Sequence, residues 1–404
     1  MIYFDFDYER AATLEEAVAL LGGLEGEARA LAGGTDLLPS MRMENVKPRV
    51  LVSLAAIEPA PPALLPDGSI RIDALSRLST LEHSSLLADQ APMIAQSAHV
   101  VGGNQIRQMG TLGGNLCQEI RCLQLDQRHD YQFVAPCYKR GGDCCYPYPR
   151  NAPDTCWSVY MSDVAPALIA LDAQVEIIGG AGTRRVPIEE LFTGNGLKPT
   201  HLGRAELVRA VTVPPAPPRS GWGFHKSTVR GGLEFGMAVM AVVLQLEEDG
   251  KTCAGARIAV GAVREKPIRP TAAEQALAGR VLDDELLARV AAEASKEVNP
   301  LPHHGFTRRH LMDNIRVYLR RTLAQAAERA GGATRARGYQ QAEVAMLDVT
   351  KTRAATRAGA RSRLVSLCVN GEWREVLVKP RHTLVEVIRD MIGLTGTKAS
   401  CESG

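Results

Sequence analysis

Hydrophobic and polar positions along the first third of the chain follow helical and strand periods in turn. Thr13 and Glu16 have the T-x-x-E spacing of a capping box, which predicts a helix through AVALL. The apolar run ARALAGG and the later PRVLVSL are each typical of a strand. A second unit begins near SIRIDALSRLS, passes through a predicted helix at APMIAQSAHVVG and reaches NQIRQMGTLGGNL. This part of the chain is therefore expected to mix helices and strands.

The regular pattern stops at about residue 117 and resumes at VAPALIALDAQVEIIGG, just after residue 160. PPAPPRSG, residues 214–221, predicts a domain boundary because prolines cannot continue a central strand. MAVMAVVLQL and TCAGARIAVGAV alternate in polarity around EEDGK, which predicts a hairpin. Helices are expected from about 271 to 298 and from 307 to 329.

The chain after residue 330 changes character. Residues 331–362 are rich in Ala, Gly, Thr and Arg without hydrophobic periodicity, which is typical of a linker. RLVSLCVNGEWREVLVKP then predicts a hairpin that turns at Asn370 and Gly371, and HTLVEVIRDMI predicts a short amphipathic helix. We therefore expect domains at 1–215 and 220–330, the linker, and a final segment at 363–404.

Composition describes an ordinary globular chain. It has 404 residues, of which 45% are hydrophobic and 23% charged, so two or three domains can each bury a core. The net charge of +2 is too small to imply nucleic acid or an anionic membrane as a partner. No stretch reaches the roughly 18 apolar residues of a membrane span, and the N-terminus lacks the pattern of a secretory leader. We expect a cytoplasmic protein with neither membrane nor nucleic-acid partners.

Two glycine-rich stretches carry candidate binding chemistry. In AGGTDLL, which we call the first glycine segment (residues 32–38), a strand ends in glycines whose amides can approach a pyrophosphate closely. In MGTLGGNL, the second glycine segment (residues 109–116), Thr111 offers a hydroxyl, and Gly113, Gly114 and Asn115 suit positive backbone angles. Each segment alone is also compatible with a simple tight turn. Neither matches G-x-G-x-x-G or the P-loop, which argues against an ordinary dinucleotide fold or an NTPase.

These segments, taken with SDVAPALIALDA, GFHKSTVRGGLEFGMA and GAVREKPIRPTAAEQAL, resemble the FAD-binding medium subunits of the molybdenum hydroxylases. That family includes xanthine dehydrogenase and carbon monoxide dehydrogenase. The resemblance covers about residues 1–330. It implies an α+β protein with a two-subdomain FAD-binding fold (PCMH/VAO-type) at 1–215, followed at 220–330 by a smaller α+β domain like that of the CO dehydrogenase flavoprotein.

The resemblance also implies which residues meet FAD. The first glycine segment would contact the pyrophosphate through its amides, the second would line the other side, and an Asp and a Lys would lie near the ribityl chain or flavin ring. The residues implied are Ala32, Gly33, Gly34, Thr35, Asp36, Leu37, Thr111, Gly113, Gly114, Asn115, Asp163 and Lys226. For Asp163 a helix cap, and for Lys226 a solvated surface lysine, are the alternatives. No catalytic residue is predicted.

Five of the nine cysteines fall between Cys122 and Cys156, which we call the cysteine segment (residues 122–156). In a reducing compartment such a cluster favours a metal or redox site over disulfides. The segment resembles an insertion in the FAD subunit of 4-hydroxybenzoyl-CoA reductases, where four cysteines hold a 4Fe-4S cluster. The implied ligands are Cys122, Cys137, Cys145 and Cys156, with Cys144 as the alternative to Cys145. The compact C-x-x-C spacing common to structural zinc sites and bacterial ferredoxins is absent. Spacing alone therefore leaves structural zinc and free thiols open as alternatives. Cys117 is expected near the flavin, as a small buried residue.

The final segment, from LCVNGEW to the end, resembles the start of the plant-type 2Fe-2S domain of the small subunit in the same enzymes. Only Cys401 corresponds to a ligand of that cluster, which needs four thiolates. We therefore expect no complete 2Fe-2S centre within residues 363–404. We also expect this segment to be poorly ordered unless another chain completes it.

Three functions are compatible with these patterns. The first is an electron-transfer subunit with FAD and a 4Fe-4S cluster, similar to that of 4-hydroxybenzoyl-CoA reductase. Electrons from ferredoxin would pass to a 2Fe-2S small subunit and a molybdenum-cofactor large subunit, in a dimer of heterotrimers by resemblance. The second is the FAD subunit of a hydroxylase acting on xanthine, an aldehyde or an aromatic heterocycle. The third is a non-catalytic, zinc-containing assembly protein.

Overall fold

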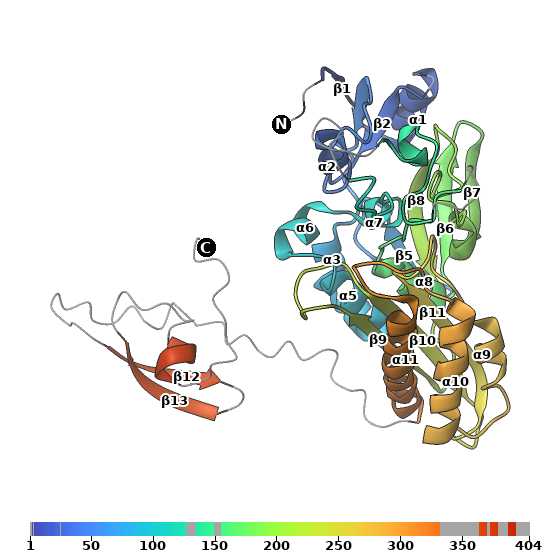
Figure 1. Ribbon diagram of the computed structural model, residues 1–404, viewed down its shortest axis with the longest axis vertical. Coiled ribbons are helices and arrows are strands. Elements are labelled where there is room, and N and C mark those ends of the chain that lie inside the picture. The colour runs from blue at the N-terminus through green and yellow to red at the C-terminus, as the bar shows by residue number, and fades with distance from the viewer. Residues whose placement is uncertain are drawn as a thin grey trace. The chain divides into compact units, whose positions relative to one another are not determined.

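A computed structural model describes most of the chain in two compact units, Met1–Gly338 and Tyr339–Gly404 (Figure 1). The described residues are 2, 4–24, 26–126, 135–148, 155–331, 363–369, 372–378 and 387–392. The predicted linker at 331–362 lies outside them except for its first residue. Among the described residues, no helix combines the length and apolar character needed to cross a membrane.

The N-terminal part of the first unit is a small parallel sheet with a helix on it. Its strands, in spatial order, are β1 (Asp7–Arg10), β3 (Val50–Ser53) and β2 (Ala28–Leu31), and its helices are α1 (Leu14–Gly23) and α2 (Leu37–Arg42). The predicted cap is present, because the Thr13 hydroxyl accepts the Glu16 amide at 3.1 Å. The Glu16 carboxylate accepts the amide of Ala12 at 2.7 Å, one residue before the amide of a standard capping box.

A five-stranded antiparallel sheet forms the middle of this unit. Its strands, in spatial order, are β4 (Ala63–Leu64), β5 (Ile70–Asp73), β8 (Leu207–Val213), β6 (Gln174–Gly179) and β7 (Gly182–Pro187). β8 comes late in the sequence yet pairs between β5 and β6, so it ties together segments separated by the whole cysteine region. The accompanying helices are α3 (Leu78–Glu82), α4 (Ser85–Gln90), α5 (Pro92–His99), α6 (Asn104–Met109), α7 (Leu112–Leu116) and α8 (Val164–Ala170), with short 3₁₀ turns η2 (Tyr138–Arg140) and η3 (Ile188–Leu191).

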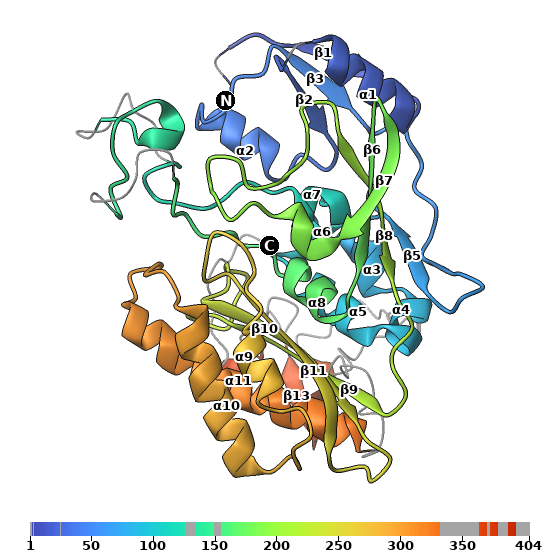
Figure 2. The same ribbon diagram turned by 90° about the vertical axis from the view of Figure 1, so that its right-hand side faces the viewer.

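The predicted hairpin is confirmed as two strands of a third, antiparallel sheet, whose strands are β9 (Ser220–Ser227), β10 (Ala238–Leu246) and β11 (Cys253–Gly261). β10 is apolar on both faces because both are covered. Val239 and Ala241 join the core around α8, whereas Met240 and Val242 pack with α10 (Asp284–Val298) and α11 (Arg308–Ala330) on the opposite face. Figure 2 shows α10 and α11 beneath this sheet, with α7 and α8 between it and the N-terminal strands.

The single helix predicted over 271–298 is wrong. The chain forms α9 (Thr271–Gln275) and then leaves the helical path, with Gly279 at φ +70°, before α10 begins. Asp283 starts α10 by accepting the Leu286 amide at 2.7 Å. The apolar periodicity continues across this break because both helices bury residues against the same sheet.

In the second unit, the predicted strands are confirmed as β12 (Arg363–Val369) and β13 (Glu372–Val378), paired antiparallel. The turn residues Asn370 and Gly371 lie outside the described residues. Of the predicted helix, Val387–Met391 forms one wide helical turn, in which the Ile392 amide donates to the Val387 carbonyl at 2.9 Å. Cys401 also lies outside the described part of the chain. The expectation that this segment is poorly ordered without another chain stays a prediction.

Candidate functional site

A cavity of about 600 Å³ lies in the first unit where the two glycine segments meet β9, and we call it the glycine cavity. The structure brings together on its wall all the residues that sequence reasoning assigned to a cofactor, except Gly113. They are Ala32, Gly33, Gly34, Thr35, Asp36, Leu37, Thr111, Gly114, Asn115, Asp163 and Lys226. Segments far apart in the sequence thus share one cavity of the size that holds small ligands and cofactors.

The two glycine segments touch at Gly33. A Cβ added there would lie 2.0 Å from the carbonyl oxygen of Met109 and 2.9 Å from the Cα of Gly110, so only glycine fits. Gly34 follows in the left-handed region at φ +71° and turns the chain into α2. This close approach brings the two glycine segments together at the cavity.

The positive backbone angles predicted for the second glycine segment are absent. Gly113, Gly114 and Asn115 belong to the short helix α7, and Thr111 caps it by accepting the Gly114 amide at 3.1 Å. Gly113 is small for a different reason. A Cβ there would lie 2.9 Å from the Cβ of Ala74, and its amide donates to the Ala74 carbonyl at 2.7 Å. Gly113 therefore packs α7 onto the core and does not line the cavity.

Asp163 and Lys226 form a buried ion pair at the cavity, with Nζ and Oδ2 2.7 Å apart and side chains only 4% and 5% exposed. Lys226 Nζ also donates to the Val100 carbonyl at 2.8 Å. Asp163 occupies the cap position of α8 but makes no capping hydrogen bond, and its buried Oδ1 has no hydrogen-bond partner among the residues that the structure describes. Burial raises the pKa of Asp163 from 3.8 to about 6, against the opposing charge of Lys226. The two alternatives considered from the sequence, a helix cap for Asp163 and a solvated surface lysine for Lys226, are therefore both wrong.

Other residues of the wall escaped sequence reasoning. Gly102 and Gly103 precede α6, and Leu233, Glu234 and Phe235 reach the cavity from the loop between β9 and β10. The glycine pair in VVGGN was a readable signal, and the later loop lies within the motif GFHKSTVRGGLEFGMA, of which only Lys226 was assigned to the cofactor. Cys117 lines the cavity as expected, but the residue is exposed, so the expectation that it is a small buried residue is wrong.

A second cavity, of about 560 Å³, lies beside the first and is lined by Cys122, Cys137, Cys145 and Cys156; we call it the cysteine cavity. These are the four predicted ligands, whereas Cys144 is not on the wall. Burial raises the pKa of the Cys122 thiol, and the neighbouring Cys137 and Cys145 raise it further. Burial likewise raises the pKa of Cys156 to about 11. The four thiols therefore lie near one another in a largely apolar environment.

No three His, Cys, Asp or Glu side chains among the described residues converge closely enough to hold a single metal ion.

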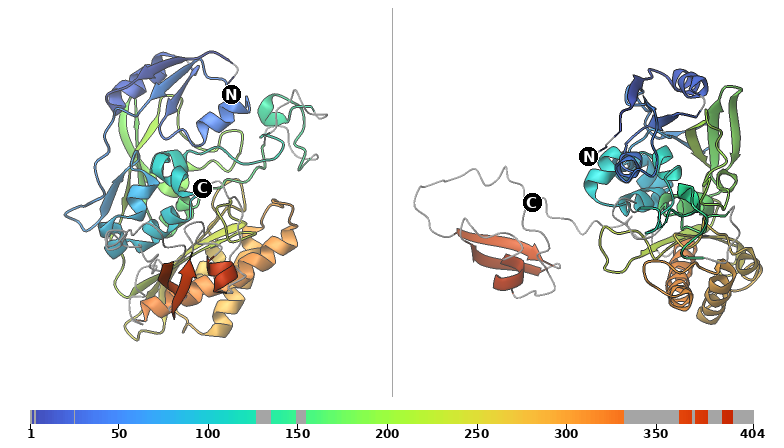
Figure 3. Two further views of the ribbon diagram at one scale, coloured as in Figure 1. Left: turned by 90° about the vertical axis from the view of Figure 1, so that its left-hand side faces the viewer. Right: turned by 45° about the horizontal axis from the view of Figure 1, so that its top comes forward.

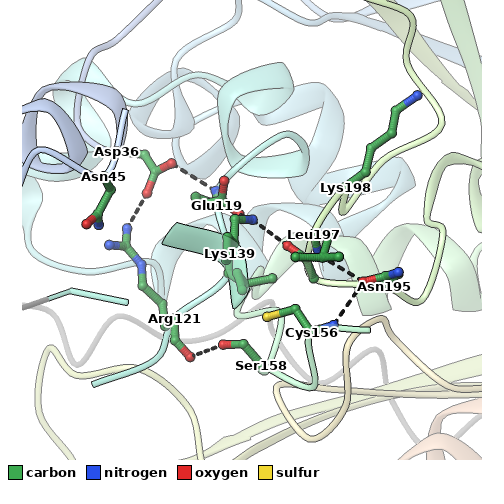
Figure 4. Close-up of polar contacts among 12 residues, drawn as sticks. Asp36, Asn45, Glu119, Arg121, Lys139, Cys156, Ser158, Asn195, Leu197 and Lys198 are labelled. Atoms are coloured by element: carbon green, nitrogen blue, oxygen red, sulfur yellow. Dashed lines mark hydrogen bonds and ion pairs between the residues drawn. The ribbon is translucent and has the colours of Figure 1, made fainter. Parts of the chain in front are cut away.

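Polar contacts hold the residues just before the cysteine segment against the first glycine segment. Arg121 Nη2 donates to Asp36 Oδ1, while Asp36 Oδ2 accepts the Glu119 amide at 2.9 Å (Figure 4). Lys139 pairs with Glu119 and also donates to the Gly196 carbonyl. Figure 3 shows η2, which carries Lys139, at the outer edge of the unit beside α2.

The chain matches two family descriptions in sequence. Residues 4–216 match the FAD-binding domain in molybdopterin dehydrogenase, and residues 223–326 match the CO dehydrogenase flavoprotein C-terminal domain.

Several known proteins are similar over most of the chain. The FAD-binding subunit of an aldehyde oxidoreductase from Escherichia coli K12 is 31% identical over 67% of this chain and 86% of its own length. Subunit alpha of the 6-hydroxypseudooxynicotine dehydrogenase complex from Paenarthrobacter nicotinovorans is 27% identical over 80% of this chain and 95% of its own. A solved structure of carbon monoxide dehydrogenase from Hydrogenophaga pseudoflava superposes with a TM-score of 0.66 and 25% identity, covering 81% of this chain and 99% of that one.

Proposed function

Because the chain belongs to the family of FAD-binding medium subunits of the molybdenum hydroxylases, we propose that it carries electrons through FAD within a multisubunit oxidoreductase. Membership confirms the predicted FAD-binding fold with its flavoprotein C-terminal domain and places the protein among oxidoreductases that bind FAD. The observation that carries the proposal is the glycine cavity. One cavity collects all the expected cofactor residues but Gly113 from four separate stretches of sequence.

The residues present fit the cofactor. Residues 32–37 line the glycine cavity, where their backbone amides would meet a pyrophosphate, and Gly33 permits the close contact with Met109 that shapes this edge. Asp163 Oδ1 has no hydrogen-bond partner among the described residues and would accept a hydrogen bond from the ribityl chain or the flavin ring. Lys226 keeps that carboxylate oriented. FAD in such a site exchanges electrons in pairs with one partner and singly with another, while the protein positions it and excludes water.

We propose that the partners are a large subunit with the molybdenum cofactor and a small subunit with 2Fe-2S centres, assembled as a dimer of heterotrimers. The names of similar proteins support a complex that oxidises its substrate, since they include an aldehyde oxidoreductase, a xanthine dehydrogenase and a nicotine 6-hydroxylase. The favoured reaction is therefore hydroxylation of an aldehyde or an aromatic heterocycle on the large subunit. We assign electron transfer to this chain because the residues around its glycine cavity fit FAD.

A second candidate rests on the cysteine cavity. Four thiols on one wall support a 4Fe-4S cluster held by Cys122, Cys137, Cys145 and Cys156, with Cys145 favoured over Cys144 because only the former lines the cavity. This site would suit a reductase similar to 4-hydroxybenzoyl-CoA reductase, which takes electrons from ferredoxin. The relatives identified above do not support that substrate or donor, and both stay predictions.

We further propose that residues 363–404 are the start of a 2Fe-2S domain completed by another chain or a longer protein. The β12–β13 hairpin is compatible with the opening strands of such a domain. A cytoplasmic location also remains our proposal. Every described cysteine is a free thiol, which suits a reducing compartment.

The test is anaerobic purification of the whole chain, followed by visible absorbance and assays of FAD, iron, acid-labile sulfide and zinc. One FAD per chain supports the proposed function, and about four irons support the second candidate. Cys122→Ser and Cys137→Ser should then lose iron but keep FAD. Cys253→Ser is the matched control, because Cys253 is buried in β11 away from both cavities. A chain that binds no FAD after reconstitution would contradict the proposed function. FAD without iron would remove the second candidate alone.

A further inference from the structure

The glycine cavity and the cysteine cavity share a wall of side chains. The residues that line both are Arg121, Met161, Phe235 and His304. Arg121 is the one among these four that carries a permanent charge, since guanidinium stays protonated at any ordinary pH. A group bound in either cavity therefore lies against this cation.

The backbone fixes where Arg121 sits. Its amide donates to the Val159 carbonyl at 3.1 Å, and its carbonyl accepts the Ser158 hydroxyl at 2.6 Å (Figure 4). Its guanidinium carbon lies 5.1 Å from the centre of the Phe235 ring, within the range of a cation–π contact. These contacts come from the residues just after the cysteine segment and from the β9–β10 loop, so two separate parts of the fold position Arg121.

The charge of Arg121 is balanced by the first glycine segment. Asp36 Oδ1 accepts from Arg121 Nη2, and both side chains are about three-quarters buried. Asp36 Oδ2 is already used by the Glu119 amide. One donor is left over, because Nε of Arg121 is buried and has no hydrogen-bond partner in the described part of the chain. In a native protein a buried unpaired donor calls for an explanation, and a ligand acceptor in an adjoining cavity is one.

We infer that Arg121 is a positioning residue whose charge, set against Asp36, adjusts the reduction potential of FAD in the glycine cavity and links that cavity electrostatically to the cysteine cavity. The inference rests on the proposed function. Reduction adds negative charge to a flavin, and a nearby cation at reduced dielectric favours the more negative form. Removing Arg121 also leaves Asp36 as an uncompensated anion, which lowers the reduction potential of the flavin further.

This pair therefore predicts shifts of opposite sign. Arg121→Gln should lower the midpoint potential of the bound flavin, and Asp36→Asn should raise it, because the first removes the cation and the second removes the anion. A tenfold change in the ratio of reduced to oxidised flavin corresponds to about 30 mV for a two-electron couple, and we expect at least that in each variant. Arg121→Lys keeps the charge and should stay near the wild type.

The matched control is Arg140→Gln. Arg140 is another arginine of this region, within the cysteine segment, and donates to Asn45 Oδ1 at 2.8 Å and to the Leu125 carbonyl at 3.0 Å, but it lines neither cavity. Its loss should leave the potential unchanged. The measurement is a dye-equilibrated anaerobic titration of the full-length, FAD-loaded chain, followed by flavin absorbance.

Opposite shifts in Arg121→Gln and Asp36→Asn, with Arg121→Lys and Arg140→Gln unmoved, would support the inference, because a merely structural role would not produce opposite signs. If Arg121→Gln does not fold, the upward shift in Asp36→Asn decides the matter alone. Equal potentials in all FAD-loaded variants would overturn the inference and leave the proposed function intact. A wild-type chain without FAD would overturn both.

Discussion

Asp163 pairs with a lysine 63 residues later in the chain, and this pair is the most deeply buried charge at the candidate site. Breaking such a pair leaves one charge stranded in a poorly solvated place, which costs far more than losing an exposed pair. We expect Lys226→Met to lower the free energy of unfolding by about 3–5 kcal/mol and to weaken FAD retention. Urea unfolding with and without FAD measures both.

The control for that variant is Lys296→Met. Lys296 pairs with Glu293 at 2.9 Å, but both side chains are more than half exposed, so its removal should change stability by less than about 1 kcal/mol. Equal losses in the two variants would contradict the importance assigned to burial.

Asp163 also predicts a pH dependence. Burial raises its pKa from 3.8 to about 6, so the folded state holds this proton more tightly than the unfolded state does. The resulting stabilisation is complete below about pH 4 and is lost as pH rises through about 6, by up to about 3 kcal/mol. Asp163→Asn removes the titrating group. The stability of the wild type relative to Asp163→Asn should therefore fall across this range in urea unfolding. If the stabilities of the wild type and Asp163→Asn changed in parallel with pH, the raised pKa assigned to Asp163 would be refuted.

At this scale, sequence reasoning found the residues but not their arrangement. Asp163 and Lys226 were readable from the motifs SDVAPALIALDA and GFHKST, but their pairing depends on α8 and β9 packing together. Gly113 shows the reverse. A glycine in a glycine-rich motif was assigned to the cofactor, although it is small because Ala74 lies against it.

Between elements, the decisive contact is the one between the turn after β2 and the residues that precede α7. Gly33→Ala would place a Cβ 2.0 Å from the Met109 carbonyl oxygen, which backbone cannot easily avoid. We expect a loss of about 1–3 kcal/mol in stability and of most FAD binding, as for overpacked sites. Thermal unfolding and the ratio of FAD to protein test this.

Gly180→Ala provides the comparison, because a Cβ there meets nothing within 4 Å. It should retain both FAD and stability. If Gly33→Ala behaved in the same way, the close approach of the two glycine segments would have no role in binding.

Elements were predicted well where one periodicity covers one element. The β10–β11 hairpin follows from alternation, and α11 matches the helix predicted from 307 to 329 by periodicity. Thr307 caps this helix by accepting the His310 amide at 3.3 Å. The division of residues 271–298 into α9 and α10 was missed, since buried positions on both sides of Gly279 continue the same apolar pattern. Pattern reports which residues face the core, not whether the helix between them is continuous.

On the scale of the whole molecule, every described residue that lines either cavity lies in the unit Met1–Gly338. The similar subunits align with about 80% of this chain, and the alignment covers 95% or more of their own length. A protein consisting of residues 1–338 should therefore bind FAD with the same stoichiometry and spectrum as the full chain. Loss of FAD from this shorter protein would show that residues 339–404 contribute to the site.

The sequence by itself determined the local chemistry of this protein: the glycine segments, the four thiols of the cysteine segment and the family to which these motifs belong. Such features are local because backbone freedom and side-chain type do not depend on distant residues. Only the tertiary structure decided that Arg121 separates two cavities, that Asp163 and Lys226 are buried together, and that Cys145 rather than Cys144 lines the cysteine cavity. These outcomes depend on how β8, β9 and α8 pack segments more than 60 residues apart, and no local pattern encodes such packing.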